Sequence, residues 1–262
     1  MPADPTPPTH QILDRTVTIP VRIRHATCFV AGFTAAATAA SAAIARAGGG
    51  TTRLGPLQIR TGRTMCMLVF VDYIDGDLGP YNEFGVCFLV EDPADPPASR
   101  IAALRALAKG DARALIHRLP VDGEFTLAAG RGIWGFPKTL AHFDVDHDSA
   151  TKHGRVSADG RLIVDVSVRK GLRVPDTSGD TVLNAYSQLD GVLRATPWRM
   201  TGTAGTRTRL GGASLTLGDH EIARELSGLK LSRRALMTSS VGHLEMSFGD
   251  AETVDPTGNS AV

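Results

Sequence analysis

The sequence has almost no net charge, and little in it would attract a polyanion. Its 28 lysines and arginines offset 27 acidic residues, which leaves a formal charge of +1. A local basic cluster at residues 230–234 has no aromatic residues between its cations, as a nucleic-acid surface would need. We therefore expect this cluster to be a solvated face, and we expect no nucleic-acid partner.

Cysteine is also scarce. Cys28, Cys66 and Cys87 are odd in number, lie far apart and sit among apolar residues. Buried reduced thiols explain this pattern better than a disulfide framework does.

The sequence lacks the signatures of the common hydrolases. Its eight histidines show neither the HExxH nor the HxxxH spacing of zinc sites, and it contains no GxSxG nucleophile elbow. Zinc-dependent hydrolysis and serine acyl transfer therefore have no support in the sequence, and we expect no metal site.

Signals for export and for membrane insertion are weak as well. Residues 1–8 show no basic region followed by an apolar core, so we do not expect a secretory signal. Residues 26–45 are uncharged and about as long as a bilayer span. Most of them are Ala, Thr and Ser, which gain little in hydrocarbon. We expect no membrane partner and a cytoplasmic location.

What the chain does contain is a series of apolar, β-favouring runs separated by turn residues. The turn signals between these runs predict strands that lie next to one another, as Asp159-Gly160 does for a hairpin. We expect three such strand pairs, formed by residues 65–73 with 83–91, 153–156 with 162–168, and 192–201 with 207–217.

Helical spacing is limited to a few segments. We expect an alanine-rich helix from about Thr34 to Ala47, two short helices between Ala98 and Arg118, and a last helix from His220 to Leu229 with Asp219 as its cap. These elements predict a β-dominated α+β domain with peripheral helices.

No internal repeat and no long linker divides the chain. We therefore expect an N-terminal extension over residues 1–18, a single domain over residues 19–249 and a mobile tail over residues 250–262.

Two motif-like stretches have simpler explanations. Residues 130–135 match GxGxxG, but a dinucleotide loop must open a helix, and Pro137 holds Phe136 extended. The acidic stretch 144–148 looks like a metal box, yet alternation along a strand places His147 on the opposite face from its aspartates. The stretch also lacks the glycine and closing glutamate of a calcium loop. We expect no nucleotide site at the first stretch and a solvated strand end at the second.

Lys138 has unusual neighbours for a lysine, because it ends the apolar stretch Trp134-Gly-Phe-Pro-Lys. If this stretch is extended, Trp134, Phe136 and Lys138 share one face, and two aromatic rings wall the amine. Burial disfavours an ammonium, so the pKa of the lysine would fall and a free amine could attack a carbonyl. The residues alone leave open a second interpretation, in which Lys138 is a surface lysine in a turn.

Four stretches of the sequence resemble the acetoacetate decarboxylase family. Two of them, residues 79–83 (GPYNE) and 130–138 (GRGIWGFPK), look like its signature segments. Residues 185–194 and 236–243 are similar to later blocks of that family, so the resemblance runs from about residue 21 to residue 248.

The resemblance implies a fold and a set of site residues. The implied fold is a closed β-barrel or cone of antiparallel strands, usually in a homo-oligomer. Lys138 would form a Schiff base with a β-keto acid, and Glu83 would work beside it. An arginine of the substrate site matches Arg24 by position, although His25 is equally close.

Two tyrosines, Tyr81 and Tyr186, are candidate hydrogen-bond donors to the substrate, and each could equally be a core aromatic. Trp134 and Phe136 complete the expected substrate-binding set. No cofactor is required, because the lysine imine supplies the electron sink.

Three positions depart from the family pattern. Thr139 replaces the second lysine that follows the nucleophile in the prototype, so a lowered pKa of Lys138 would have to come from burial or from an arginine such as Arg131. A second glutamate expected upstream of Glu83 falls at Leu68, and the glutamate expected after the motif arginine is Gly132.

These departures leave three functions open. We expect a Schiff-base lyase that decarboxylates a β-keto acid. The first alternative is an aldolase-dehydratase that uses the same lysine on pyruvate or a small ketone plus an aldehyde. The second alternative is a barrel without turnover that binds a small ligand.

Overall fold

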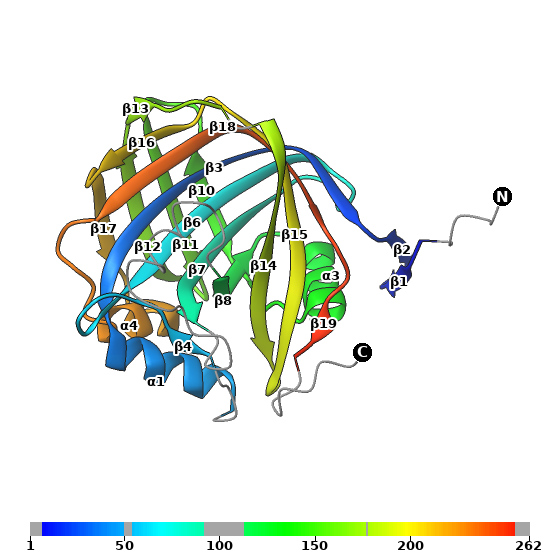
Figure 1. Ribbon diagram of the computed structural model, residues 1–262, viewed down its shortest axis with the longest axis horizontal. Helices are drawn as coiled ribbons and strands as arrows, with labels where there is room; N and C mark the ends of the chain where they lie inside the picture. Colours follow the sequence, from blue (N-terminus) through cyan, green and yellow to red (C-terminus); the bar gives the residue numbers. More distant parts are fainter. Residues whose placement is uncertain (1–6, 50–53, 92–112, 177, 255–262) are drawn as a thin grey trace.

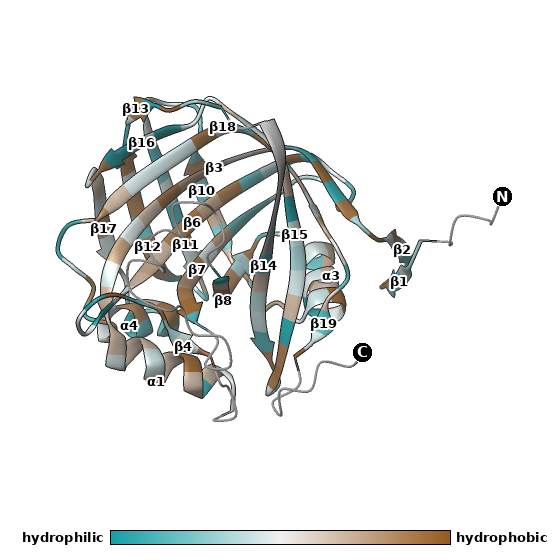
Figure 2. Cartoon of the chain, in the orientation of Figure 1, coloured by the Kyte–Doolittle hydropathy of each residue, from teal (hydrophilic) through white to brown (hydrophobic). Residues whose placement is uncertain are grey.

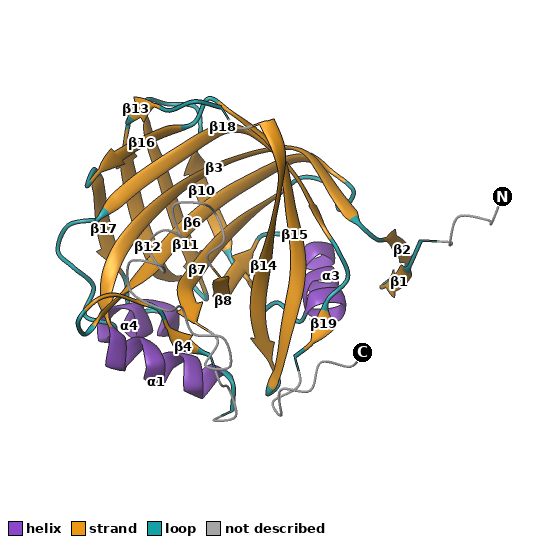
Figure 3. Cartoon of the chain, in the orientation of Figure 1, coloured by secondary structure: helices purple, strands orange, loops and turns teal. Residues whose placement is uncertain are grey.

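The computed structural model describes residues 7–49, 54–91, 113–176 and 178–254. Strands dominate this part of the chain, and three helices accompany them (Figures 1 and 3). The helices are α1 (Ala37–Ala47), α3 (Glu124–Trp134) and α4 (Glu221–Gly228). The fold is therefore β-dominated, as the sequence predicts.

Seven long strands form the centre of the molecule. They pair in the order β18–β3–β6–β7–β8–β14–β15, and β15 pairs again with β18, so the sheet returns to its starting strand. These strands are β3 (Val21–Ala36), β6 (Arg63–Gly76), β7 (Tyr81–Glu91), β8 (Arg113–Val121), β14 (Ser178–Leu189), β15 (Val192–Ala204) and β18 (Met237–Phe248).

Shorter strands complete this large sheet and form two others. The short strands of the large sheet are β4 (Gly55–Pro56), β5 (Gln58–Arg60), β9 (Lys138–Leu140), β13 (Leu172–Arg173), β16 (Arg207–Leu210) and β19 (Glu252–Thr253). The four-stranded sheet contains β10 (His142–Asp146), β11 (Thr151–Ala158), β12 (Arg161–Arg169) and β17 (Ala213–Leu217), and a separate hairpin contains β1 (Thr9–Ile12) and β2 (Arg15–Thr18).

The pairing is not antiparallel throughout, which corrects one expectation. Strand β8 pairs in parallel with β14 and with β9. Parallel neighbours need a crossover between them, and α3 supplies it between β8 and β9. This β8–α3–β9 unit brings Lys138, the first residue of β9, to the edge of β8.

The large sheet buries residues on both faces, and hydrophobic residues recur along its strands (Figure 2). The first core includes residues of the four-stranded sheet and of α1 and α4, which lie together at the lower left of Figure 1. The second core includes residues of α3 and of the β1–β2 hairpin, among them Ile12 and Val17. The segment expected as an N-terminal extension thus contributes to this second core.

The predicted strands are present, but one predicted pair is wrong. Residues 65–73 and 83–91 pair in β6 and β7, and residues 153–156 and 162–168 pair in β11 and β12. Residues 192–201 lie in β15, whose partners are β14, β18 and β19 rather than β16 or β17. Long-range partners decided this pairing, and local turn signals do not reveal them.

Two of the helix predictions need correction. Residues 113–118 belong to strand β8 rather than to a helix. Leu115 and Leu119 of this strand are buried in different cores, and a strand that is buried on both faces can show apolar residues at helical spacing. The rest of that predicted pair of helices, residues 98–112, lies outside the described residues. Helix α1 begins at Ala37, because Thr34 and Ala35 still pair with β6.

The predicted C-terminal helix is confirmed as α4, but its cap is His220 rather than Asp219. The Nδ1 atom of His220 accepts a hydrogen bond of 3.3 Å from the amide of Ile222. At the other end of the domain, Glu252 and Thr253 of the expected tail form β19, and residues 255–262 lie outside the described residues.

The acidic stretch 144–148 is the end of β10 and the following turn, as the sequence predicts. The Oδ1 atom of Asp146 accepts hydrogen bonds of 2.9 Å from the amides of Asp148 and Ser149. Among the described residues, no three His, Cys, Asp or Glu side chains are grouped so that they could hold a metal ion.

None of the helices in the described ranges is long and apolar enough to span a membrane.

Candidate active site

The β6–β7 hairpin brings three polar side chains onto the α3 side of the large sheet. Tyr73 lies directly opposite Tyr81 in the antiparallel register, and Val71 lies opposite Glu83. Residues two apart on a strand share a face, so Tyr73, Tyr81 and Glu83 point to the same side. Tyr73 and Glu83 form a diagonal pair, which long side chains can bridge.

The end of helix α3 delivers the lysine to this group. Gly135 ends the helix in the left-handed conformation, with φ of 61°, and its amide bonds the carbonyl of Arg131. The amide of Lys138 then bonds the carbonyl of Phe136 across Pro137, with an N–O distance of 2.7 Å. Lys138 enters β9 opposite Leu119 of β8.

This geometry corrects the expectation of an extended stretch from Trp134 to Lys138. Trp134 is the last residue of α3, so the GxGxxG-like residues lie at the C-terminal end of a helix. A phosphate group binds at the opposite end, where free amides point outward. The structure therefore agrees with the sequence-based exclusion of a dinucleotide loop, although the reason differs.

Lys138 and Glu83 meet in the protein interior. The Nζ atom of Lys138 lies 2.8 Å from Oε2 of Glu83, and the two residues are 2% and 9% exposed. Buried charges are found in proteins where they are paired, and this pair satisfies that rule. The structure thus excludes the interpretation of Lys138 as a surface lysine.

The aromatic ring that faces the amine belongs to Tyr81. The Nζ atom of Lys138 lies 4.9 Å from the centroid of this ring, within the range of a cation–π contact. Trp134 and Phe136 stack on each other with centroids 5.5 Å apart, and both contact Phe248. The indole of Trp134 also donates a hydrogen bond of 2.7 Å to the carbonyl of Gly249.

Tyr73 is a member of the site that the sequence analysis missed. Its hydroxyl donates a hydrogen bond of 2.9 Å to Oε1 of Glu83, and its ring stacks on Tyr81 with centroids 4.2 Å apart. Burial, reinforced by the negative charge of Glu83, raises the pKa of both tyrosines well above the usual 10. The register of the β6–β7 hairpin could have identified Tyr73 as a site residue, because it pairs Tyr73 with Tyr81.

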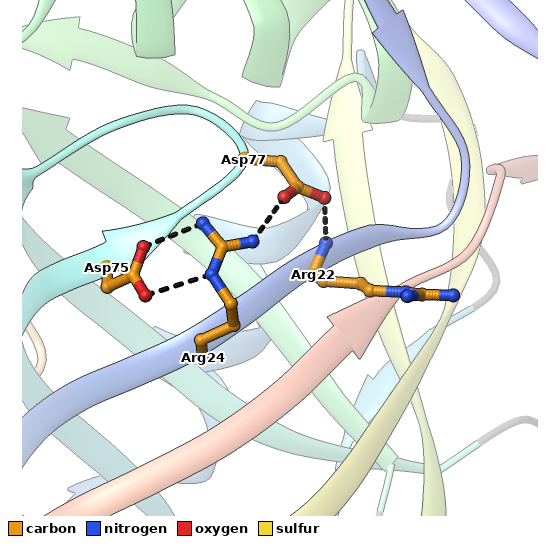
Figure 4. A network of polar contacts seen from close by, with 4 residues as sticks. All are labelled: Arg22, Arg24, Asp75 and Asp77. Carbon is orange, nitrogen blue, oxygen red and sulfur yellow. Dashed lines mark hydrogen bonds and ion pairs between the residues drawn. The ribbon is translucent and has the colours of Figure 1, made fainter.

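Arg24 lies in a surface network with the end of β6 and the β6–β7 turn (Figure 4). Its guanidinium donates to both oxygens of Asp75, at 2.7 and 2.9 Å, and to Asp77 at 2.6 Å. The amide of Arg22 donates to the other oxygen of Asp77. The donors of Arg24 are therefore engaged by carboxylates of the protein.

Tyr186 packs in a different core from Tyr73 and Tyr81. It belongs to the first core, with residues such as Leu115 and Leu193, whereas Tyr73 and Tyr81 belong to the second. Of the expected substrate-binding residues, Tyr81 is the one whose ring faces the lysine amine.

The departures from the family pattern now have a structural setting. Thr139 is exposed and follows Lys138 on strand β9, so a lysine at this position would point away from the amine of Lys138. Leu68 is fully buried in the first core, on the far side of the sheet from Glu83. Glu83, Tyr73 and Tyr81 are thus the oxygen groups that this hairpin supplies on the α3 side of the sheet.

The cysteines do not supply a competing nucleophile. All three are free, and Cys66 is buried while Cys28 and Cys87 are partly buried. Burial raises the pKa of Cys28 and of Cys87 to about 12 and raises that of Cys66 as well, so all three remain thiols at neutral pH.

A polar hollow of about 410 Å³ lies on the other face of β6 and β7. Its walls include Asp72 and Asn82, the strand neighbours of Tyr73 and Glu83, together with Asp146 and His147. Neighbouring strand residues point to opposite faces, so this hollow is not the space around Lys138.

The same fold occurs in solved structures of low sequence identity. An acetoacetate decarboxylase from Legionella pneumophila superimposes with a TM-score of 0.64 at 17% identity, over 97% of this chain and 92% of that one. MppR, an enzyme of enduracididine biosynthesis, gives 0.59 at 14% identity, over 98% of each chain. An acetoacetate decarboxylase-like enzyme from Sphingomonas wittichii RW1 gives 0.54 at 11% identity, over 91% of this chain and 94% of that one.

A search of curated protein sequences found no match. A sequence model of the family described as "Acetoacetate decarboxylase (ADC)" matches residues 54–255, which include the β6–β7 hairpin, α3 and Lys138. That match covers well over half of the chain, so the resemblance noted in the sequence is confirmed. The chain belongs to the acetoacetate decarboxylase family.

Proposed function

We propose that this protein is a lyase in which Lys138 forms a Schiff base with a small keto acid and in which decarboxylation follows. The observation that carries the proposal is the buried contact of 2.8 Å between Nζ of Lys138 and Oε2 of Glu83. A lysine can act as a nucleophile only after it has lost a proton, and Glu83 is placed to accept it.

The proposed reaction begins when the ammonium of Lys138 gives a proton to Glu83. The free amine adds to the substrate carbonyl to form a carbinolamine. Glu83 returns its proton to the hydroxyl of that carbinolamine, so water leaves and an iminium remains. Carbon dioxide then departs as the electrons of the broken carbon–carbon bond move into the iminium and form an enamine. One proton taken up from solvent protonates the enamine carbon, and hydrolysis releases the ketone.

Aldol addition followed by dehydration is the second candidate. The solved structures of MppR include complexes with pyruvate and with the condensation product of pyruvate and imidazole 4-carboxaldehyde. In this chain Leu68 and Thr139 replace the second carboxylate and the second lysine of the decarboxylase pattern. The same enamine could therefore attack an aldehyde instead of being protonated.

The circuit of strands that closes between β15 and β18 supports a further part of the proposal, namely that the seven long strands form a closed cone around the reacting groups. We also propose that the protein works as a homo-oligomer in the cytoplasm. Sedimentation of the purified protein would measure the number of subunits, and a single species at 27.7 kDa would contradict the oligomer.

Borohydride trapping tests the imine directly. The protein is incubated with acetoacetate, or with pyruvate plus an aldehyde, and then reduced. We expect the added mass on the peptide that contains Lys138. Lys138→Ala should abolish both the adduct and turnover, whereas Lys170→Ala, which removes an exposed lysine, should change neither.

The products distinguish the candidate functions. Release of carbon dioxide from acetoacetate supports decarboxylation, and a condensed enone from pyruvate plus an aldehyde supports the aldolase-dehydratase. If the wild-type protein gains no mass with any of these compounds, the Schiff-base proposal is wrong and a ligand-binding protein without turnover is the better description.

A further inference from the structure

We propose that Tyr73 is the positioning residue of the base: its hydroxyl holds one oxygen of Glu83, so that the other oxygen alone exchanges protons with the nitrogen of Lys138. This inference rests on the Schiff-base function proposed above. It adds a residue that neither the family signatures nor the sequence analysis singled out.

The two oxygens of Glu83 have different partners. Oε1 accepts the hydrogen bond of 2.9 Å from Tyr73, and Oε2 lies 2.8 Å from Nζ of Lys138. The terminal torsion of a glutamate is broad and roughly two-fold, so a carboxylate without such a donor can exchange its oxygens by rotation. A donor fixed at Oε1 keeps Oε2 directed at the lysine.

Tyr73 is itself held rigidly. It is 3% exposed, and its ring stacks on Tyr81 at an interplanar angle of 12°. The two tyrosines are direct neighbours across β6 and β7, so the strand register fixes the stack and with it the position of the hydroxyl. The hydroxyl of Tyr73 therefore reaches Glu83 from a fixed point.

The hydroxyl also remains a donor throughout the reaction. Burial and the charge of Glu83 favour the neutral phenol over the phenolate, so Tyr73 keeps its proton at the pH at which the lysine chemistry runs. It accepts no proton from the substrate and is not a general acid. Its part is to orient the carboxyl group.

This arrangement fixes the path of each proton. When Lys138 loses its proton to Glu83, the proton resides on Oε2, while Oε1 is the carbonyl oxygen that still accepts from Tyr73. The proton on Oε2 then faces the carbinolamine hydroxyl, which leaves as water. After loss of carbon dioxide, Glu83 takes one proton from solvent on the same oxygen and passes it to the enamine carbon.

Removal of the Tyr73 hydroxyl alone should impair the positioning of Glu83 and leave the nucleophile, Lys138, unchanged. Tyr73→Phe keeps the ring and its stacking on Tyr81 but leaves Oε1 of Glu83 without its donor. We expect kcat to fall by about 10- to 100-fold, a fraction of what general acid–base catalysis contributes, and KM to change by less than about twofold. The imine should still form, because Lys138 is unchanged.

Two measurements separate these steps. Borohydride reduction in the presence of acetoacetate reports the imine, and exchange of the methyl hydrogens of acetone in D₂O, followed by proton NMR, reports proton transfer through the enamine. After an incubation long enough to reach equilibrium, we expect Tyr73→Phe to be trapped to the same extent as the wild type, and we expect it to exchange acetone at least about tenfold more slowly. A matched control is Thr64→Val, which removes another buried hydroxyl of β6, one that donates to the carbonyl of Leu57. This control should exchange at the wild-type rate.

Replacement of Tyr73 by 4-aminophenylalanine provides a rescue, because the amino group restores a donor on a ring of the same shape. Acetone exchange should return to within about threefold of the wild type. The rescue also keeps the test valid if the phenylalanine variant folds poorly. Exchange and kcat within twofold of wild type in a folded Tyr73→Phe variant would overturn the inference while the imine stands. Absence of any adduct on wild-type Lys138 would overturn the proposed function, and this inference with it.

Discussion

Gly130 of α3 lies directly against the aliphatic chain of Lys138. A methyl group on the α-carbon of Gly130 would lie 2.4 Å from Cδ and 2.6 Å from Cε of the lysine. Two carbon atoms that are not bonded to each other do not approach this closely. Helix α3 therefore has no side chain at this point, and the lysine crosses the helix surface to reach Glu83.

Gly130→Ala should lower activity without destabilising helix α3. Alanine favours a helix over glycine by about 0.8–1.0 kcal/mol, so α3 itself should not be weakened. The new methyl must displace the chain of Lys138, and a misplaced nucleophile loses rate steeply. We expect activity to fall by about 100-fold, measured as kcat/KM in the assay that trapping identifies.

Gly132→Ala is the control for this prediction. It adds the same methyl two residues later, where the nearest atom is the end of the flexible Ile12 side chain at 3.2 Å. Activity of this variant should stay within about twofold of wild type. Equal losses in the two variants would mean that helix changes in general, rather than contact with Lys138, impair the enzyme.

The contributions of Lys138 and Glu83 to the free energy of unfolding should be coupled. Removal of one partner leaves a buried charge without its counterion, which costs about 3–5 kcal/mol. We expect Lys138→Met and Glu83→Gln each to be destabilised on that scale. The double variant should be more stable than the sum of the single losses predicts, by about 1–3 kcal/mol. Urea unfolding of the four proteins measures this coupling, and additive losses would show that the two charges do not interact.

Substitution of Arg24, in contrast, should have little effect on KM. Its side chain is half exposed and bound to Asp75 and Asp77, and exposed ion pairs contribute little to stability. If it does not hold the substrate carboxylate, Arg24→Ala should change KM by less than about twofold. A rise in KM of tenfold or more with the keto acid, without loss of the folded state, would restore Arg24 to the substrate site.

Acid stability should depend on Glu225 of α4. Its carboxylate accepts a hydrogen bond of 2.8 Å from Arg118 and lies 3.1 Å from Nε2 of the buried His117. Burial alone would raise the pKa of Glu225, but the contacts with His117 and Arg118 outweigh it and lower the pKa from 4.5 to about 2. A lowered pKa in the folded state stabilises the protein above pH 4.5. This contribution disappears as the pH falls from about 5 to about 2.

Thermal unfolding between pH 7 and pH 2 checks this prediction. The wild type should lose stability over the lower part of the range, whereas Glu225→Gln should start less stable and show a flatter dependence. Glu221→Gln changes an exposed carboxylate of the same helix and should keep the wild-type slope. Parallel curves for wild type and Glu225→Gln would contradict the assignment.

The sequence predicted well those features that depend on residues close to one another in the chain. The hairpin of β6 and β7 followed from two apolar runs around a turn, and Asp159-Gly160 marked a true hairpin, in which both residues have positive φ. The apolar stretch before Lys138 indicated a buried lysine, and the structure confirms its burial. Each of these signals lies within a few residues of the feature it predicts.

What the sequence could not supply was the set of partners across the fold. The residues of β8 are buried on both faces, so their spacing imitated that of a helix. Helix α3 was missed because its two glycines, Gly130 and Gly132, are typical of a loop. The sequence identifies Tyr73 only as the end of a predicted strand, whereas the structure places it opposite Tyr81. The aromatic neighbours expected for the amine were its sequence neighbours, whereas the observed one, Tyr81, comes from another strand.

The β8–α3–β9 unit has a consequence for how activity arises during folding. Glu83 and Tyr73 come together within one hairpin, but Lys138 joins them only when β9 has docked on β8 and α3 has closed over the sheet. Contacts between distant segments form after local ones, because closing the intervening loop costs more entropy. An unfolded or half-folded chain thus holds an ordinary, solvated lysine without its base. On the function proposed above, the reactive amine therefore arises only in the folded molecule, and the chain has no special tendency to form imines with other carbonyl compounds while it folds.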